Sequence, residues 1–428
     1  MRYQEYSDYK DSGIDWLNEV PKHWELKRLG SKFTQRKEKV SDKDFEPLSV
    51  TKNGILPQLA NVAKSDASDN RKLVRKGDFV INSRSDRKGS SGLSDFDGSV
   101  SLINIVLEPN NTIDPNFCHH LLRSYLFQEE FYKYGHGIVA DLWTTNYDDM
   151  KNIYLAIPPM HEQQKIATFV NREIFKIDNL ISKQEQLIKL LEEQRKAVIL
   201  QAITKGLNLD LSMKQSGIDW IGAMPKKWQL KRLKQIASVV LGKMICNENQ
   251  GDMLLKPYLK SKNIQWLNVN LNSVDEMWFS AKELDVYKLH KDDLILSEGG
   301  EVGKTCIWNN ELDECYIQNS AHKVTLCEGY NAHYYLYFFY SMGHLGQFDR
   351  VINKVSIAHL TKEKLLNIPV LIPSIDEQNQ IVEFIESENR KINNLINKQS
   401  KLIEKLKEYR SSIISHAVTG KIDVREAL

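Results

Sequence analysis

The sequence predicts an α+β protein: two unlike globular domains separated by a pair of long antiparallel coiled-coil helices, with an internal pseudo-two-fold duplication. Two observations predict this architecture. Two blocks of the chain each occur twice, and the second block of each copy is a long stretch without Gly or Pro whose apolar residues recur at helical spacing. Between the repeated blocks, each copy holds a segment that does not match its counterpart.

The first repeated block opens each copy. Residues 10–29 return as residues 214–233, an offset of 204, and both carry Ser-Gly-Ile-Asp-Trp followed by Pro-Lys-X-Trp and Leu-Lys-Arg-Leu. A single tryptophan is most simply a core residue. Because these tryptophans recur together with glycines and prolines, we expect them to dock each globe onto a helix end. The paired residues are Gly13/Gly217, Trp16/Trp220, Pro21/Pro225 and Trp24/Trp228.

The second repeated block predicts a long helix in each copy. Residues 157–202 match residues 372–417 at an offset of 215, and apolar residues recur in heptad steps. The runs without Gly or Pro, 161–204 and 376–419, hold 44 residues each, which predicts helices about 66 Å long. Helices of this length need a partner for their apolar stripe. We expect them to pair within the chain; the alternative is a stalk that joins separate chains.

These blocks divide the chain into segments. We expect the first globe at 1–157, the central long helix at 158–206, the second globe at 207–372 and the C-terminal long helix at 373–428. The unmatched parts, 34–150 and 238–365, show the pattern of mixed strands and short helices bounded by Gly, Asn and Asp. The expected strands are 78–82, 100–107, 293–297 and 323–326, and the expected helices are 116–133 and 331–342.

Composition and charge exclude several protein classes. The 58 Lys and Arg residues against 56 Asp and Glu residues give a formal charge of +2, so any basic surface must be local. The absence of an apolar signal segment and of a run of about 20 apolar residues predicts a cytoplasmic protein without a membrane span. Five cysteines without a CxxC pair predict reduced thiols. A zinc site is the alternative, but the ligand spacing matches no knuckle or ribbon. Its ligands would be Cys306, Cys315, His322 and Cys327.

Two stretches of the chain resemble catalytic motifs, but each lacks residues that its motif requires. Residues 299–305 resemble a phosphate loop, but that motif requires Gly at the position of Glu298, so we expect a strand-to-turn loop. Adenine methyltransferases carry Asp/Asn-Pro-Pro-Tyr/Phe, whereas Pro158-Pro159 lacks both the polar and the aromatic neighbour. We interpret these prolines as helix-entry residues. The sequence therefore predicts no catalytic residue, no metal site and no cofactor in this chain.

Two basic clusters and a few polar loops predict DNA contact. Residues 22–39 hold seven basic side chains against two acidic ones, and residues 226–243 hold six basic and no acidic ones. Such clusters neutralise phosphates without reading sequence; the alternative is a solvated face. For base reading, residues 82–92, 297–305 and 318–323 supply the donors and mixed polar groups that suit base edges. The candidate DNA-binding residues are Arg84, Ser85, Arg87, Lys88, Lys27, Arg28, Lys231, Arg232, Lys304, Asn319, His322 and Lys354.

Together these motifs resemble the specificity (S) subunits of type I restriction-modification systems. The resemblance covers essentially the whole chain, including the duplicated entries, the Ile-Pro…Glu-Gln helix starts and the helix ends at Gly206 and Gly420. It implies that the unmatched segments are target recognition domains, each reading one half of a bipartite, non-palindromic DNA site, while the helices set the gap. It also implies partners: double-stranded DNA, two copies of the modification (M) methyltransferase subunit, and restriction (R) subunits. S-adenosylmethionine, ATP and Mg are then expected on those partner subunits.

Two other functions stay open at this point. A coiled-coil protein-interaction adaptor would show no salt-sensitive DNA affinity. A self-contained DNA-modifying enzyme with an unrecognised site would turn over DNA alone when supplied with S-adenosylmethionine or magnesium.

Overall fold

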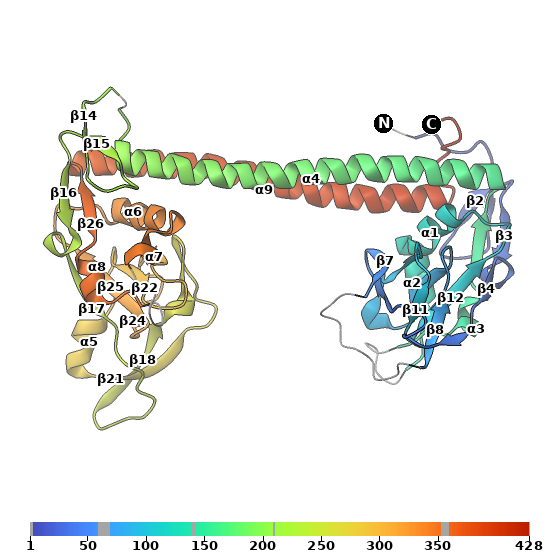
Figure 1. The fold of residues 1–428 in the computed structure, drawn as a ribbon, viewed down its shortest axis with the longest axis horizontal. Helices are drawn as coiled ribbons and strands as arrows, with labels where there is room; N and C mark the ends of the chain where they lie inside the picture. Colours follow the sequence, from blue (N-terminus) through green and yellow to red (C-terminus); the bar gives the residue numbers. More distant parts are fainter. Residues whose placement is uncertain (1–2, 59–68, 138–142, 209, 352–358, 428) are drawn as a thin grey trace. The chain divides into compact units, whose positions relative to one another are not determined.

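The computed structural model describes residues 3–58, 69–137, 143–208, 210–351 and 359–427. The chain forms two compact units, Met1–Glu185 with Ser400–Leu428, and Gln186–Gln399. Each unit contains one globe together with one part of each long helix (Figure 1). The segment boundaries expected from the sequence remain a prediction, because these units cut across both long helices.

The first globe is built around a sheet with the strand order β10-β9-β12-β4. The neighbouring strands run antiparallel, and Ile81 lies opposite both Ser91 and Ile105. Residues 79–81 of the central strand are fully buried, as a continuous apolar strand requires. A second sheet has the order β11-β8-β5. The bounds are β4 Phe33–Gln35, β5 Lys39–Val40, β8 Arg71–Val74, β9 Phe79–Asn82, β10 Ser91–Leu93, β11 Gly98–Val100 and β12 Asn104–Pro109.

The second globe repeats this sheet although its sequence does not match. Its order is β17-β25-β22-β23, so these strands take the places of β4, β12, β9 and β10. A further sheet has the order β21-β18-β24. The bounds are β17 Ala237–Leu241, β18 Met253–Leu259, β21 Asp275–Ser280, β22 Leu294–Ser297, β23 Thr305–Ile307, β24 Tyr316–Ile317 and β25 Ala321–Leu326.

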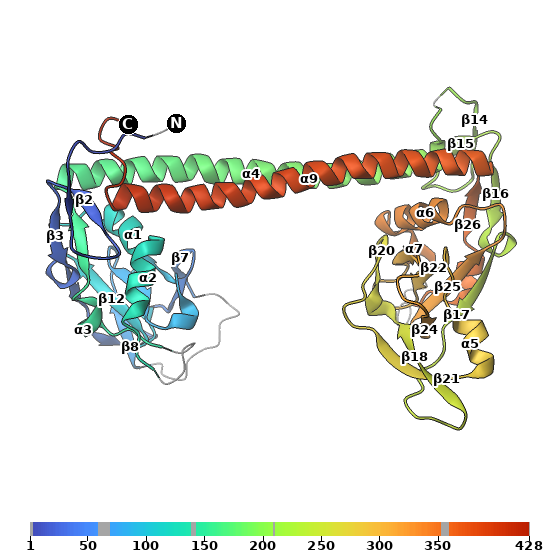
Figure 2. The same ribbon diagram turned by 180° about the vertical axis from the view of Figure 1, so that it is seen from behind.

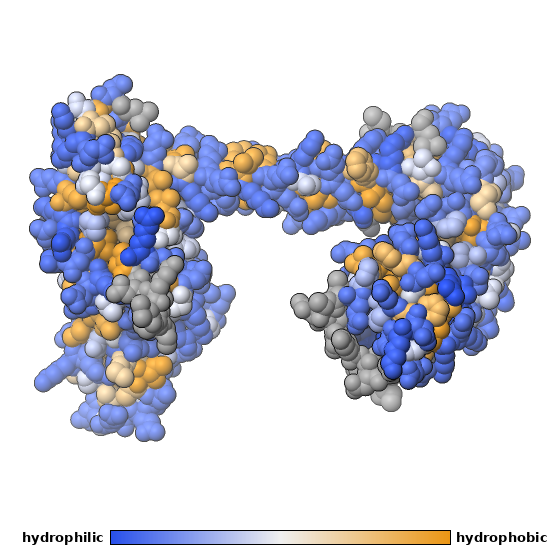
Figure 3. Space-filling view, viewed as in Figure 1, coloured by the Kyte–Doolittle hydropathy of each residue, from blue (hydrophilic) through white to orange (hydrophobic). Residues whose placement is uncertain are grey.

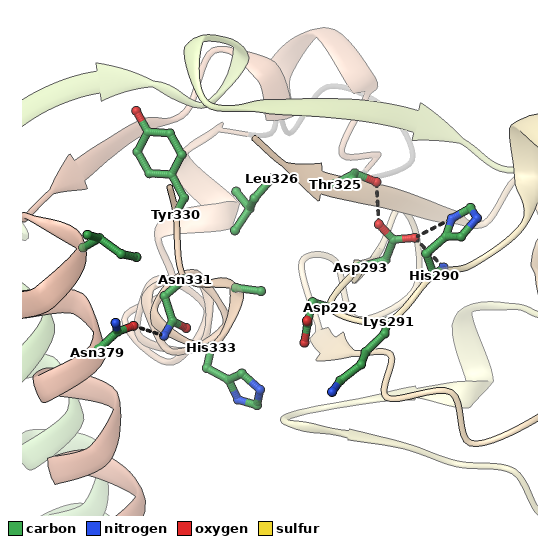
Figure 4. A pocket seen from close by; sticks show the side chains of 12 residues that line it. His290, Lys291, Asp292, Asp293, Thr325, Leu326, Tyr330, Asn331, His333 and Asn379 are labelled. Atoms are coloured by element: carbon green, nitrogen blue, oxygen red, sulfur yellow. Dashed lines mark hydrogen bonds and ion pairs between the residues drawn. The ribbon is translucent and has the colours of Figure 1, made fainter. Parts of the chain in front are cut away.

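A buried aspartate holds the turn before each central strand. Asp78 accepts the backbone N–H of Arg75 at 2.8 Å, and Asp293 accepts that of His290 at 2.8 Å. Figure 4 shows Asp293 between Thr325, whose hydroxyl also donates to it, and His290. These paired aspartates explain why the two turns share a Lys-X-Asp-apolar pattern.

Two of the expected short elements differ from the prediction, and a third agrees with it. The single helix expected at 116–133 is wrong: it is two helices, because Ser124 is extended and its hydroxyl accepts the backbone N–H of Phe127. The strand expected at 100–107 crosses the end of β11, a turn and the start of β12. The helix expected at 331–342 is confirmed as α6. The helix bounds are α1 Pro115–Arg123, α2 Tyr125–Lys133, α3 Tyr147–Met150, α5 Ala281–Tyr287, α6 Ala332–His344, α7 Gln347–Val351 and α8 Lys362–Leu366.

Both long helices are confirmed, as α4 (Met160–Lys205) and α9 (Ile375–Val418). They run antiparallel, side by side, in each unit (Figure 1, Figure 2). In the first unit, the Asp178 carboxylate of α4 accepts a hydrogen bond from Arg410 of α9 at 2.9 Å. In the second unit, Arg195 donates to Asn393 at the same pair of duplicated positions. The pairing of the helices within the chain is therefore confirmed.

The duplicated tryptophans dock each globe onto helix ends, as predicted. The indole N–H of Trp24 donates to Glu162 at 3.0 Å, and that of Trp228 donates to Glu377 at 2.9 Å, so each tryptophan contacts the start of one long helix. The end of the other helix covers the same ring, because Gly420 lies against Trp24 and Gly206 against Trp228. Trp16 and Trp220 differ from the prediction, since they pack on Phe127 of α2 and Phe338 of α6 inside the globes.

Glutamines at the helix starts perform the same task in both copies. Gln163 accepts the backbone N–H of Asp114 and donates to the carbonyl of Pro158, at 2.7 and 2.9 Å. Gln378 makes the equivalent contacts with Asn331 and Pro373, at 2.9 and 3.0 Å. The repeated Glu-Gln pair therefore joins each long helix to its globe.

Short antiparallel pairs complete each unit. β3 pairs with β13 beside the start of α4, and β16 pairs with β26 beside the start of α9. In the described part of the chain, neither long helix nor any other helix is apolar enough over a sufficient length to cross a membrane. The remaining strand bounds are β1 Tyr9–Asp11, β2 Glu19–Pro21, β3 Glu25–Arg28, β6 Leu48–Thr51, β7 Gly54–Pro57, β13 Tyr154–Ile157, β14 Met213–Gln215, β15 Ala223–Pro225, β16 Gln229–Arg232, β19 Ile264–Gln265, β20 Asn268–Val269 and β26 Pro369–Ile372.

Two adjacent histidines on α1 make the first unit sensitive to acid. Burial lowers the pKa of His119 to about 3 and that of His120 to about 4. Because an unfolded histidine titrates near 6.5, the unfolded chain binds more protons below that pH, and stability falls as the pH drops toward 4. We expect the free energy of unfolding to fall by about 2 kcal/mol between pH 7.5 and pH 5 because of His120. Urea unfolding of His120→Gln should lose part of this pH dependence, whereas exposed His161→Gln should keep all of it; equal curves for both variants would contradict the assignment.

Candidate nucleic-acid interface

The loop that follows the central strand of the first globe brings together four predicted residues. Residues 83–90 connect β9 to β10 and contain the short 3₁₀ turn Ser85–Arg87. The Arg84 guanidinium lies 2.9 Å from the carboxylate of Asp86, and that of Arg87 lies 3.7 Å from it. Both arginines are exposed, and surface ion pairs contribute little free energy. Each arginine can therefore leave Asp86 and bind DNA instead. The backbone N–H of Ser85 donates to the carbonyl of Trp143, which ties the neighbouring loop to this turn.

Lys88 is more constrained than its position in the sequence suggests. Its ammonium group pairs with Glu129 of α2 and lies 6.0 Å from the ring centres of Tyr125 and Tyr132. The pKa of Glu129 is lowered by this lysine. Lys88 therefore holds the loop against α2, and a DNA contact would have to compete with that ion pair.

The equivalent loop in the second globe has different chemistry. Residues 298–304 connect β22 to β23 as a hairpin turn, which confirms the strand-to-turn prediction for the near-match to a phosphate loop. Lys304 pairs with Glu301 and donates to Gln265 at 3.3 Å, so its charge is already engaged. The side-chain oxygen of Asn319 accepts from Gln318, and its backbone N–H donates to Lys243.

Glu298 is a candidate that the sequence argument missed. Its backbone is held by hydrogen bonds to Ser320 and Leu360, both 2.9 Å, while its carboxylate makes no hydrogen bond within the described residues. Burial raises the pKa of this carboxyl, and the nearby His359 only partly opposes the shift. A half-buried acceptor without a donor suits a base amino group, such as N4 of cytosine. The signal lay in the near-match to a phosphate loop, where Glu298 was noted only as the residue that breaks the motif.

One predicted contact residue is buried, and another lies outside the described residues. His322 is a correction: it lies on β25 with 0% exposure, its Nε2 is 2.5 Å from the carbonyl of Leu360, and burial lowers its pKa. The segment that carries Leu360 covers this side chain, so it offers no surface to DNA. Lys354 lies outside the described residues.

The basic clusters lie on a different part of each unit. Lys27 and Arg28 are on β3, where Arg28 donates to the hydroxyl of Tyr154 at 3.2 Å. Lys231 and Arg232 occupy the same places on β16. These residues flank the starts of the long helices and are not part of the hairpin loops.

The structure brings no metal-binding group together in the described residues. No cluster of three or more His, Cys, Asp or Glu side chains has the arrangement for a metal ion there. Cys306 and Cys315 are buried in an apolar cluster of the second globe, while Cys327 is exposed. Pro158 and Pro159 lie between β13 and α4, in agreement with helix-entry residues.

A cavity of about 440 Å³ lies between the turn before β22 and the starts of α6 and α9 (Figure 4). Its lining places Lys291 beside Asp292, with His290 and His333 nearby. Because opposite charges share the wall, the cavity selects neither anions nor cations. We assign it no part in DNA binding.

Residues 21–193 and 225–405 match the family model described as type I restriction modification DNA specificity domain. The chain belongs to this family. The two matched ranges cover both globes and most of both long helices, which agrees with the resemblance inferred from the motifs. Two curated proteins of Methanocaldococcus jannaschii are each 23% identical to the chain. The putative type I restriction enzyme MjaX specificity subunit aligns over 96% of both chains, and the type I restriction enzyme MjaVIII specificity subunit over 97%.

Solved structures of this family share the fold. A chain from a study of complex assembly and conformational transition of the type I R-M system superposes with a TM-score of 0.64 at 18% identity, covering 94% of this chain and 99% of that one. The HsdS subunit from Thermoanaerobacter tengcongensis superposes with a TM-score of 0.56 at 19% identity, covering 94% and 98%.

Proposed function

We propose that each globe reads one half of a bipartite, non-palindromic DNA site, and that this chain is the non-catalytic specificity subunit of a type I complex. One observation carries the proposal. The two globes present the same hairpin after the same central strand, but the first loop carries Arg84 and Arg87 whereas the second carries Glu298. Equivalent strand arrangements with different polar groups are what two different half-sites require, since base edges are distinguished by donors and acceptors.

We further propose that the long helices set the gap between half-sites and dock two copies of the M subunit. Apolar side chains reach the surface along these helices (Figure 3). Two exposed leucine positions occur in both copies with nearly equal exposure: Leu180 at 46% and Leu395 at 42%, and Leu187 at 39% and Leu402 at 41%. Paired apolar positions on duplicated helices suit two copies of one partner. Methyl transfer, ATP and Mg chemistry then belong to the M and R subunits.

The half-site assignment has a direct test. The chain and its M subunit are produced in a host without adenine methylation, and N6-methyladenine is mapped by single-molecule sequencing. We expect Arg84→Ala with Arg87→Ala to relax one half of the motif and Glu298→Ala to relax only the other. Each lost base contact should reduce discrimination about 5- to 150-fold.

A matched control is Glu328→Ala, an exposed acidic residue of the second globe that lies outside the hairpin. It should leave both half-sites unchanged. Equal loss of methylation at all sequences would make the hairpin residues phosphate contacts instead of base readers. A complex that forms but shows no salt-sensitive DNA affinity would favour the adaptor function.

A further inference from the structure

A second cavity, of about 420 Å³, lies in the first unit where the globe meets the long helices. The turn between β6 and β7 contributes Lys52 and Asn53, and the end of α1 contributes Arg123. Helices α4 and α9 supply the opposite wall. Their lining residues are Asp178, Ile181, Lys407 and Arg410.

The wall of this cavity is strongly cationic. The lining contains four basic residues, Lys52, Arg123, Lys407 and Arg410, but a single acidic one, Asp178, whose carboxylate Arg410 already binds at 2.9 Å. Within the described residues, the other three cations form no ion pair. Among the side chains that the structure describes, the cavity therefore carries more positive than negative charge.

Among the described residues, Arg123 has only neutral hydrogen-bond partners. Its guanidinium donates to the carbonyl of Lys52 at 2.6 Å and lies 3.2 Å from Nε2 of His119, and neither group is an anion. Burial lowers the pKa of Arg123, and Arg410 lowers it further. His119 is neutral at physiological pH, so it adds no charge. A half-buried guanidinium that binds no carboxylate among the described residues is well suited to bind an anion.

The second unit shows that the fold does not require this cluster. Arg410 corresponds to Arg195 and Lys407 to Glu192 at the offset of the repeat, and these two form an ion pair of 3.3 Å. Asp178 corresponds to Asn393. Arg123 is nine residues after the N-cap of α1, and Tyr340 holds that place in α6. Where the first copy has the three cations Arg410, Lys407 and Arg123, the second copy thus has an Arg–Glu ion pair and a neutral tyrosine.

We infer that this cavity, lined by Lys52, Arg123, Lys407 and Arg410, binds a phosphate group. Two guanidinium groups and two ammonium groups match the several oxygens and the multiple charge of a phosphate better than a single carboxylate. The group belongs either to a free phosphoryl compound or to the backbone of bound DNA. This inference does not depend on base reading by the hairpin loops.

The first experiment measures binding of pyrophosphate to the full chain by calorimetry and by thermal shift, against sodium chloride at equal ionic strength. We expect saturable binding in which Lys407→Gln weakens affinity at least fivefold and Arg123→Gln abolishes it. Arg195→Gln removes a cation from the corresponding junction of the second unit and should leave binding unchanged. Lys407 is exposed, so its variant separates loss of binding from loss of folding.

A second arm identifies the source of the phosphate. If DNA supplies it, Lys407→Gln weakens binding of all sequences equally, reduces the salt dependence by about one ion, and pyrophosphate competes with DNA. If a free compound supplies it, pyrophosphate binds without displacing DNA. Absence of saturable pyrophosphate binding, or equal loss in the Lys407 and Arg195 variants, would overturn the inference. Either result leaves the half-site test of the hairpin loops unaffected.

Discussion

Trp24→Ala should unfold the junction between the first globe and its helix ends, at a cost of about 3–5 kcal/mol. The side chain is fully buried, it donates to the buried Glu162, and it supports Gly420 at the end of α9. Its removal creates a cavity and takes one donor from a carboxylate that then relies on Tyr6 and His23. Hydrogen exchange measured by mass spectrometry should show faster exchange in the first unit.

The duplication supplies the matched variant. Trp228→Ala removes the same contact at the other junction, where Glu377 accepts the indole N–H. Because each tryptophan packs inside its own unit, faster exchange should follow the mutated unit. Trp143→Ala, which alters a partly exposed ring, should change the free energy of unfolding by less than about 1 kcal/mol. If Trp24→Ala loosened both globes equally, the junctions would not be independent.

Leu180→Glu and Leu395→Glu should each remove one of two bound M subunits, and the double variant should remove both. Burying either leucine contributes about 1.5–3 kcal/mol, and a glutamate at the centre of an apolar contact adds the cost of an unpaired charge. We expect affinity at the altered position to fall at least 100-fold. Native mass spectrometry of the chain mixed with its M subunit would give the stoichiometry directly.

Leu345→Glu is the control for surface hydrophobicity. Leu345 follows α6 in the second globe and is 41% exposed, much like the helix leucines, but it has no place on α4 or α9. Its variant should still bind two M subunits. Loss of both copies from a single helix variant would show that the copies bind cooperatively, and unchanged binding in the double variant would contradict docking on these leucines.

The helices and the duplication were predictable because their signals are local. A 3.6-residue period, a run without Gly or Pro, and the proline and glycine at the ends specify α4 and α9 almost to the residue. The repeated Trp, Glu and Gln residues identified the junctions, although the sequence did not show that Trp24 contacts Glu162. The break at Ser124 was missed because a serine inside an apolar pattern is equally compatible with a continuing helix and with a cap.

The candidate site was only partly predictable, because exposure and charge pairing depend on distant residues. Sequence placed the loops at 82–92 and 297–305 after equivalent strands, and the structure shows both as the hairpin that follows the central strand. It did not show that Lys88 and Lys304 meet Glu129 and Glu301. Nor did it show that the Glu298 carboxylate has no ion-pair partner in the described part of the chain.

The amino-acid sequence alone determined the duplicated architecture, the long helices and the family, because repeated residues and helical periodicity are visible without coordinates. Only the tertiary structure decided which polar side chains are free. The segment at Leu360 covers His322, and α1 brings Arg123 near Arg410, whose carboxylate partner Asp178 forms no ion pair with Arg123. The burial and pairing of a side chain depend on contacts between residues far apart in the chain. These contacts decide whether a charged group is neutralised within the protein or can bind a ligand.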